Sequence, residues 1–188
     1  MVRKIFIALT LFTITLGCSN EVVNEIAADI PASNSNSKPI VSKVSKEDAD
    51  IYVYKSPDCG CCKTWIDHLE NEGMKVAFED VQDVSPYKDQ YGVPYNMASC
   101  HTGLIKGYAI EGHVPAWDIE RLIKEKPDGV VGLSVPRMPK GTPGMEMDDA
   151  NSVKDPYDVV AIKSDGTSYV FTSYPKGGNK KEDGVKVN

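Results

Sequence analysis

The chain has little of two things: long apolar runs and positive charge. Its N-terminal apolar stretch runs only from Ile5 to Leu16, short of the roughly 20 residues that a transmembrane helix needs. The formal net charge is −6, whereas proteins that bind nucleic acid carry basic patches. We therefore expect neither a membrane-spanning protein nor a nucleic-acid-binding protein.

The first residues are typical of an export signal. Arg3 and Lys4 precede the apolar stretch, which ends at small residues, as in secretory signal peptides. Leu16-Gly17-Cys18 also resembles the box at which lipoproteins are cleaved and their cysteine is acylated. We expect a signal peptide over residues 1–17, export to the periplasm or cell envelope, and lipidation of Cys18. The alternative is an ordinary soluble-export signal from which Cys18 is discarded.

Residues 18–48 are expected to form a flexible tether. The segment Pro31–Pro39 has no large apolar residue, so it cannot support a core. A lipid-anchored cysteine followed by such a segment would hold a domain at a membrane by its anchor only. The remainder of the chain is long enough for one domain with a real core.

From residue 49 onward the pattern alternates between strands and helices. Tyr52 and its β-branched neighbours predict a strand over 51–54. Apolar residues then recur at helical spacing from Cys62 to Leu69, and Gly73 ends that helix. A short helix begins at Ser85 as its cap, with proline in the first turn. The other expected elements are strands at 74–78 and 130–133, a hairpin of 102–105 with 108–110, and a helix after Pro115.

The C-terminal third is irregular and then returns to strands. Val135–Met147 is rich in Met, Pro and Gly, which excludes a regular helix or central strand. Strands at 157–162 and 169–172 flank Ser164-Asp165-Gly166, a strong hairpin signal. The tail after Pro175 is expected to be frayed. We therefore divide the chain into a domain at 49–148 and a C-terminal β-hairpin with a tail at 149–188.

Three of the five cysteines fall within Cys59-Gly60-Cys61-Cys62, at the start of the first expected helix. A helix N-terminus favours thiolate over thiol, so sulfurs there are suited to redox chemistry or metal binding. Cys100 stands beside His101, and His113 follows in a Gly-His-Val-Pro turn. These residues predict a compact site of sulfur and imidazole.

Thiolate, thioether and imidazole are the ligands that suit Cu(I), whereas Mg²⁺ and Ca²⁺ prefer oxygen ligands. Four sulfurs with nearby imidazoles could hold more than one Cu(I), because a thiolate can bridge two metals. One tetrahedral Zn²⁺ is the alternative, and export makes zinc the less expected metal. Met145, in the irregular segment, is the methionine that we select as a thioether ligand.

The order strand, Cys-x-x-Cys, helix, strand, helix, hairpin, helix resembles a thioredoxin-like domain of the glutaredoxin type. The resemblance implies that His101 falls near the cis-proline position of that fold, beside the redox cysteines, although no proline stands there. It also implies that Cys100 and His101 lie next to Cys59 and Cys62. The expected fold class is therefore α/β, a thioredoxin-like domain with a Met/Pro/Gly-rich loop and a C-terminal β-hairpin.

A more specific resemblance covers about residues 50–148. It is carried, in order, by the motifs at 54–62, 98–102, 107–108, 111–116 and 139–146. Together they resemble the CopG-like family of exported bacterial proteins, long catalogued as a domain of unknown function and linked to copper resistance. The resemblance implies a thioredoxin-like fold that binds copper through cysteines and histidine, with redox activity as a further implication.

The leading hypothesis is an envelope copper-binding protein that sequesters or relays Cu(I) in copper homeostasis or resistance. Its partners would be copper ions and other envelope copper-handling proteins. Cys59, Cys62, Cys100 and His113 are the first expected ligands. The additional expected ligands are Cys61, His101 and Met145.

Two other hypotheses stay open. In the first, the protein is a thiol-disulfide or copper-dependent oxidoreductase, with Cys59 as the attacking thiol and Cys62 as the resolving thiol. In the second, the two cysteines form a structural disulfide in an interaction module. His101 as a core histidine is likewise an alternative to its role as a ligand, and we expect His68 to be an exposed surface residue.

Overall fold

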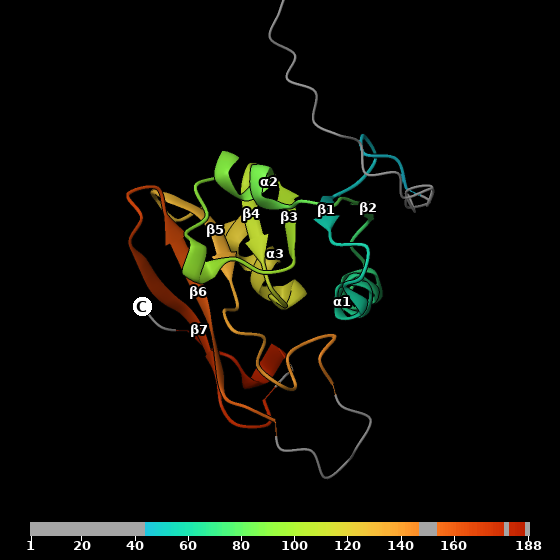
Figure 1. The fold of residues 1–188 in the computed structure, drawn as a ribbon. Helices are drawn as coiled ribbons and strands as arrows, with labels where there is room; N and C mark the ends of the chain where they lie inside the picture. The colour runs from blue at the N-terminus through green and yellow to red at the C-terminus, as the bar shows by residue number, and fades with distance from the viewer. Residues whose placement is uncertain (1–43, 147–153, 179–180, 187–188) are drawn as a thin grey trace, which may run out of the picture. The chain divides into compact units, whose positions relative to one another are not determined.

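Figure 1 shows the computed structural model, which describes residues 44–146, 154–178 and 181–186. The expected signal peptide, Cys18 and all but the end of the expected tether lie outside the described residues. Within those described ranges, none of the helices has the length and apolar character that crossing a membrane requires.

Eight strands form one mixed sheet in the order β2-β1-β3-β4-β5-β6-β7-β8. The strands are β1 (Ile51–Lys55), β2 (Val76–Asp80), β3 (His101–Ile105), β4 (Tyr108–Glu111), β5 (Val130–Ser134), β6 (Tyr157–Lys163), β7 (Ser168–Tyr174) and β8 (Val185–Lys186). The helices are α1 (Gly60–Asn71), α2 (Ser85–Gln90) and α3 (Ala116–Glu125), with short 3₁₀ turns η1 (Tyr95–Met97) and η2 (Lys181–Asp183). This architecture confirms the predicted α/β class.

Strand pairing brings two distant segments of the chain together at one end of the sheet. β1 pairs in parallel with β2 and antiparallel with β3, and Lys55 lies opposite His101 in that register. The loop that leaves β1 therefore starts beside the residues that enter β3. This is the position at which the cysteine motif and Cys100 meet.

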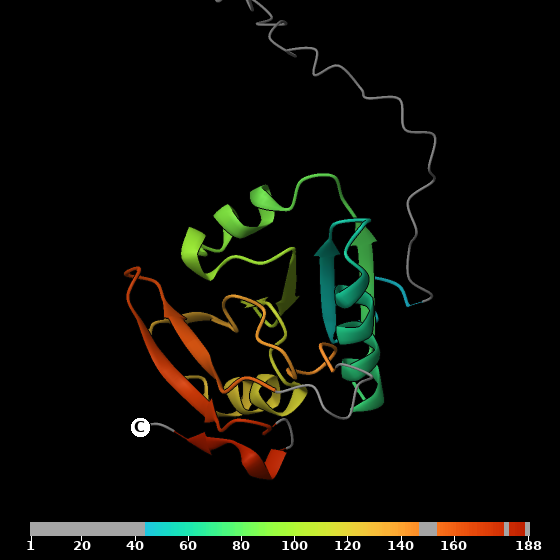
Figure 2. The ribbon, with the colours of Figure 1, turned by 60° about the horizontal axis from the view of Figure 1, so that its bottom comes forward.

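Helices cover both faces of the sheet (Figure 2). α1 and α3 bury Trp65, Leu69 and Leu122 in the main core against strand residues such as Val53. On the opposite face, the segment of α2 and η1 covers a smaller cluster around Val93. Alternate strand residues face the two clusters, as the two-residue period of a strand requires.

The first helix forms as the apolar spacing predicts. Its buried positions are those of the predicted helical face, including Cys62 and Trp65. Gly73 follows the helix with a φ of 93°, a conformation that glycine adopts without steric cost. Gly103 on β3 lets α1 approach, because an added Cβ would lie 2.8 Å from Ile51 Cδ1 and 3.3 Å from the Trp65 ring.

Two local predictions are corrected. Val84, not Ser85, is the residue before α2, and its side chain makes no capping hydrogen bond. The turn is instead closed by Asp83, whose Oδ1 accepts the Ser85 N–H at 2.8 Å. Asp side chains commonly bond to the backbone two residues onward. The second strand also begins at Val76 rather than at residue 74.

The C-terminal hairpin continues the sheet. β6 pairs with β5, and β7 pairs with β6, so the hairpin and the preceding segment share one sheet. The expected frayed tail is wrong for the described residues, because η2 and β8 follow and β8 pairs with β7 through Thr172 and Lys186. β8 thereby pairs part of the β7 edge, where backbone groups would otherwise lack a strand partner.

Candidate metal centre

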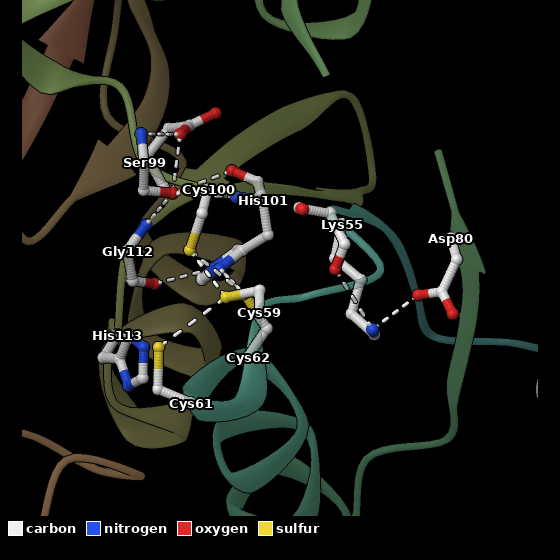
Figure 3. Close-up of a disulfide and its surroundings, with 12 residues drawn as sticks. Lys55, Cys59, Cys61, Cys62, Asp80, Ser99, Cys100, His101, Gly112 and His113 are labelled. Atoms are coloured by element: carbon white, nitrogen blue, oxygen red, sulfur yellow. Dashed lines mark hydrogen bonds and ion pairs between the residues drawn. A yellow bond between two sulfur atoms is a disulfide. The ribbon is translucent and has the colours of Figure 1, made fainter. Parts of the chain in front are cut away.

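The cysteine motif lies where β1 turns into α1. Cys59 is the residue before the helix, and its N–H donates to the Ser56 carbonyl at 3.1 Å. Cys59 and Cys62 form a disulfide, while Cys61 and Cys100 are free thiols. The structure thus shows the Cys-x-x-Cys pair in its oxidised form, as Figure 3 illustrates.

Cys100 completes a cluster of four sulfurs. Its Sγ lies 2.7 Å from Cys59 Sγ and 3.2 Å from Cys62 Sγ. Cys61 Sγ lies 3.6 Å from Cys59 Sγ, and all four sulfurs lie within 4.8 Å of one another. The expectation that Cys100 lies beside the two outer cysteines of the motif is confirmed. Four sulfurs this close together can hold a metal once the disulfide is reduced and the thiols are deprotonated.

Burial keeps Cys100 protonated at neutral pH. Removal from water, together with the neighbouring Cys61, raises the pKa of the Cys100 thiol to about 11. A soft metal that binds here therefore has to displace a proton from Cys100, and its affinity should increase with pH.

His101 points a free nitrogen at the sulfurs. The side chain is fully buried and stacks on Trp65 with ring centroids 4.4 Å apart. Its Nε2 lies 3.0 Å from the Gly112 carbonyl, which can only accept, so Nε2 carries the proton and Nδ1 carries the lone pair. Nδ1 lies 3.3 Å from Cys62 Sγ. Burial lowers the pKa of His101 to about 3, which keeps the imidazole neutral.

In His113 the other ring nitrogen, Nδ1, carries the proton. Its Nδ1 lies 2.7 Å from the Pro143 carbonyl and therefore donates to it. Nε2 is buried and has no hydrogen-bond partner among the described residues. Burial lowers the pKa of His113 as well, and the His101 and His113 rings have centroids 5.8 Å apart. A buried nitrogen with an unused lone pair is a feature that a bound metal would explain.

The loop that carries Met145 packs on α1. An added Cβ on Gly144 would lie 2.6 Å from Trp65 N, and Met145 makes its hydrogen bonds through its backbone, to Thr142 and Gly141. The structure therefore places the loop beside the helix that carries the cysteines. The thioether of Met145 as a ligand stays a prediction.

The expectation for His68 is corrected. It is only partly exposed, its Nε2 accepts the Ala116 N–H at 3.1 Å, and its ring meets Trp117 edge to face. A histidine that accepts the first N–H of α3 joins the two helices. The apolar spacing of α1 alone could not show this, because the partner is 48 residues away.

Sequence reasoning also missed two buried ion pairs near the cysteines. Lys55 pairs with Asp80 at 2.5 Å, with the side chains 7% and 8% exposed (Figure 3). Lys88 pairs with Glu111 at 2.9 Å, with side chains 9% and 0% exposed. A charged residue gives no sequence signal of its own burial, because that burial depends on a partner that the fold supplies.

Comparisons with known proteins identify the family of the chain. The family described as "Protein of unknown function, DUF411" matches residues 97–145. A solved structure named "Copper resistance protein copG- Form 1" is 48% identical, has a TM-score of 0.61, and aligns over 66% of this chain and 96% of its own. The chain belongs to the CopG-like family.

A second CopG structure, "Copper resistance protein copG- Form 2", is 47% identical with a TM-score of 0.60, over 66% of this chain and 97% of its own. No curated protein matches the chain. The DUF411 match includes Cys100, His101, His113 and Met145, whereas the Cys59–Cys62 motif precedes it.

Proposed function

We propose that this CopG-like protein binds copper as Cu(I) at the four-sulfur cluster and sequesters or relays it. The observation that carries the proposal is the gathering of Cys59, Cys61, Cys62 and Cys100 within 4.8 Å. Two neutral imidazoles add nitrogen lone pairs at His101 Nδ1 and His113 Nε2. Sulfur-rich sites with imidazole favour Cu(I) over hard cations. The solved relatives are named for copper resistance.

Copper binding requires the reduced protein. In the disulfide, Cys59 and Cys62 have no thiolate to offer. A dithiol reductant that opens this bond delivers two electrons and releases both sulfurs as ligands. With four thiolates available, bridging sulfurs can serve more than one Cu(I), so we propose a multinuclear site.

An anaerobic titration of the reduced full chain with Cu(I), against a chromophoric chelator, tests this proposal. We expect tight uptake of two or more Cu(I) per chain, stronger than the uptake of Zn²⁺ measured in parallel. The oxidised chain, with Cys59 and Cys62 joined, is the matched control and should bind less. Cys59→Ser should lower copper affinity or stoichiometry while the circular dichroism spectrum stays that of the wild type. Weak uptake by the reduced chain would contradict the proposal.

The disulfide itself favours a second function, thiol-disulfide exchange. Cys59 is 9% exposed and Cys62 is fully buried, so an incoming thiolate would reach Cys59 first. It would form a mixed disulfide with Cys59 as Cys62 leaves as a thiolate. A second thiol of the donor would then release Cys59, so the donor becomes a disulfide and the pair a dithiol. Oxidation of one dithiol donor per chain by the metal-free disulfide form, with a second disulfide as the acceptor for further turnovers, would support this function, and its absence would exclude it.

We also propose that the glutaredoxin-type description of the fold holds for residues 49–148. The support is the element order: β1, α1, β2, α2, the β3–β4 hairpin and then α3. An experimental structure superposed on a glutaredoxin checks this, since a different path of β1 to β4 would refute it.

Export and lipid anchoring are proposed from the sequence. The support is the basic and apolar start of the chain and the Leu16-Gly17-Cys18 motif. Cys18→Ala should move the protein from the membrane fraction to the soluble fraction of an expressing bacterium. Unchanged fractionation would contradict the anchor, and retention in the cytoplasm would contradict export.

A further inference from the structure

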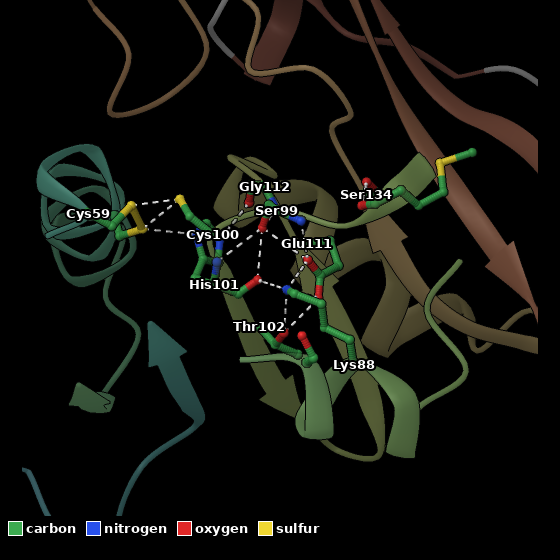
Figure 4. Close-up of polar contacts among 12 residues, drawn as sticks. Cys59, Lys88, Ser99, Cys100, His101, Thr102, Glu111, Gly112 and Ser134 are labelled. Atoms are coloured by element: carbon green, nitrogen blue, oxygen red, sulfur yellow. Dashed lines mark hydrogen bonds and ion pairs between the residues drawn. A yellow bond between two sulfur atoms is a disulfide. The ribbon is translucent and has the colours of Figure 1, made fainter. Parts of the chain in front are cut away.

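A buried ion pair lies directly behind the segment that carries Cys100 and His101 (Figure 4). Lys88 reaches in from α2, and its Nζ donates to the His101 carbonyl at 2.8 Å and to Thr102 Oγ1 at 2.9 Å. The same Nζ lies 2.9 and 3.1 Å from the two carboxylate oxygens of Glu111. The ammonium group thus binds β3 at the residue that supplies the imidazole.

Glu111, at the end of β4, holds the other side of that segment. Its Oε2 accepts the Ser99 N–H at 2.9 Å and lies 3.0 Å from Ser99 Oγ. Its Oε1 accepts the Thr102 hydroxyl at 2.7 Å. The carboxylate is completely buried and therefore spans Ser99 to Thr102, the stretch in which Cys100 and His101 lie.

Ser99 links the Glu111 carboxylate to Gly112, whose carbonyl fixes the tautomer of His101. Its Oγ accepts the Gly112 N–H at 2.9 Å and the His101 N–H at 3.3 Å. The carbonyl of the same Gly112 accepts the His101 Nε2 proton. A chain of hydrogen bonds therefore runs from Lys88 and Glu111 through Ser99 and Gly112 to the ring of His101.

We propose that Lys88 and Glu111 are positioning residues of the copper site. They hold the Ser99–Thr102 segment so that Cys100 Sγ and His101 Nδ1 face the cysteines of α1 before any metal arrives. This inference rests on the proposed copper binding for its functional meaning, but the geometry that it invokes belongs to the metal-free protein.

Contribution to stability alone does not account for the pair. Replacing both members of a buried ion pair by apolar residues is often neutral or stabilising, whereas removing one member is destabilising. The bonds of Lys88 and Glu111 go to the ligand-bearing segment, including the carbonyl of His101 and the N–H of Ser99. Partners of this kind orient metal ligands, and their loss typically lowers metal affinity about 10- to 100-fold.

The test compares Cu(I) affinity in matched variants of the reduced full chain. Glu111→Gln should weaken Cu(I) binding about 10- to 100-fold. Asp118→Asn is the control, because Asp118 is also a buried carboxylate and accepts bonds from Thr172 and Tyr174. These two partners lie on β7, and Arg121 of α3 lies 3.5 Å from the same carboxylate, so the substitution should destabilise the fold and leave Cu(I) affinity unchanged.

A double variant separates positioning from stability. Lys88→Leu with Glu111→Leu removes both charges without adding a thioether that could itself bind Cu(I), so we expect it to recover the stability that Glu111→Gln loses. Copper affinity should stay low in the double variant, because the Ser99 anchor is missing. Affinity that returns with stability, or an equal loss in Asp118→Asn, would overturn the inference.

A spectroscopic measurement keeps the inference independent of copper uptake. In the metal-free wild type, nitrogen NMR of His101 should show a proton on Nε2 and none on Nδ1. Glu111→Gln should give a mixture of both tautomers, whereas Asp118→Asn should not. If the wild type takes up no copper, the proposed function fails and this measurement still decides the positioning role. An unchanged His101 tautomer in Glu111→Gln would refute it.

Discussion

Gly144 is the residue at which a single methyl group should disturb both the fold and the site. Its φ is 78°, a region in which residues other than glycine cost roughly 1–2 kcal/mol. An added Cβ would also lie 2.6 Å from Trp65 N and 2.8 Å from Trp65 Cα. Both atoms belong to the backbone of α1, so no side-chain rotation can relieve the contact.

Gly166 provides the matched control for Gly144→Ala. Its φ is 81°, and nothing lies within 4 Å of an added Cβ. Gly166→Ala should therefore show the conformational cost alone. Gly144→Ala should lose more, by about 1–3 kcal/mol, the usual cost of inserting a methyl group into a packed region. Urea unfolding of the two metal-free variants measures the difference in the free energy of unfolding.

Gly144→Ala should also disturb the hydrogen bond that holds His113. Pro143, the residue before Gly144, supplies the carbonyl that accepts the His113 Nδ1 proton. Displacing the loop from α1 should loosen this bond and weaken Cu(I) binding, while Gly166→Ala should leave binding unchanged. Equal destabilisation by the two substitutions would refute the proposed contact between the loop and α1.

Three further predictions concern buried titratable groups. Asp80→Asn leaves Lys55 buried without its partner and should cost about 3–5 kcal/mol of the free energy of unfolding; Lys55→Met in the same chain should recover most of it. Burial lowers the pKa values of His101, to about 3, and of His113, so below about pH 6.5 the unfolded chain binds protons that the folded chain does not. The stability of the metal-free protein should therefore fall as pH drops from about 6.5 toward 3, by up to about 1.4 kcal/mol per pH unit for His101, with His113 adding to the loss in the same direction, and His101→Gln should reduce that slope in urea unfolding. Burial raises the pKa of Cys100 to about 11, so its alkylation, followed by mass spectrometry, should be slow at pH 7 and accelerate toward pH 11; a rate that levels off near pH 8 would contradict this.

The elements that local pattern defines could be predicted from the sequence. α1 follows from apolar spacing, and its buried face is the predicted one. The two hairpins follow from turn residues at Lys106-Gly107 and Asp165-Gly166, and both form. The motif at the start of α1 is likewise local, because the helix begins at Gly60.

The position of Cys100 beside that motif could not be predicted from local sequence pattern alone. The two segments are 41 residues apart, and only the register implied by the resemblance to a thioredoxin-like fold brought them together. The pairing of Lys55 with His101 across β1 and β3 is the physical cause. Burial of Lys88 and Glu111 could not be predicted, because its reason is a network that exists only when α2, β3 and β4 are assembled.

The oxidised cluster and a copper-loaded cluster exclude each other, because two of the four sulfurs are shared between the disulfide and the metal. The contacts that support the other ligands are already formed in the oxidised, metal-free protein. Gly112 and Pro143 hold the two imidazoles through backbone carbonyls, and Glu111 holds the Cys100 segment through Ser99. In the proposed function, oxidation of Cys59 and Cys62 would release copper and their reduction would allow it to bind again. Under the proposed function, the four-sulfur cluster would therefore serve either copper handling or thiol-disulfide exchange at a given moment, according to whether Cys59 and Cys62 are reduced or joined.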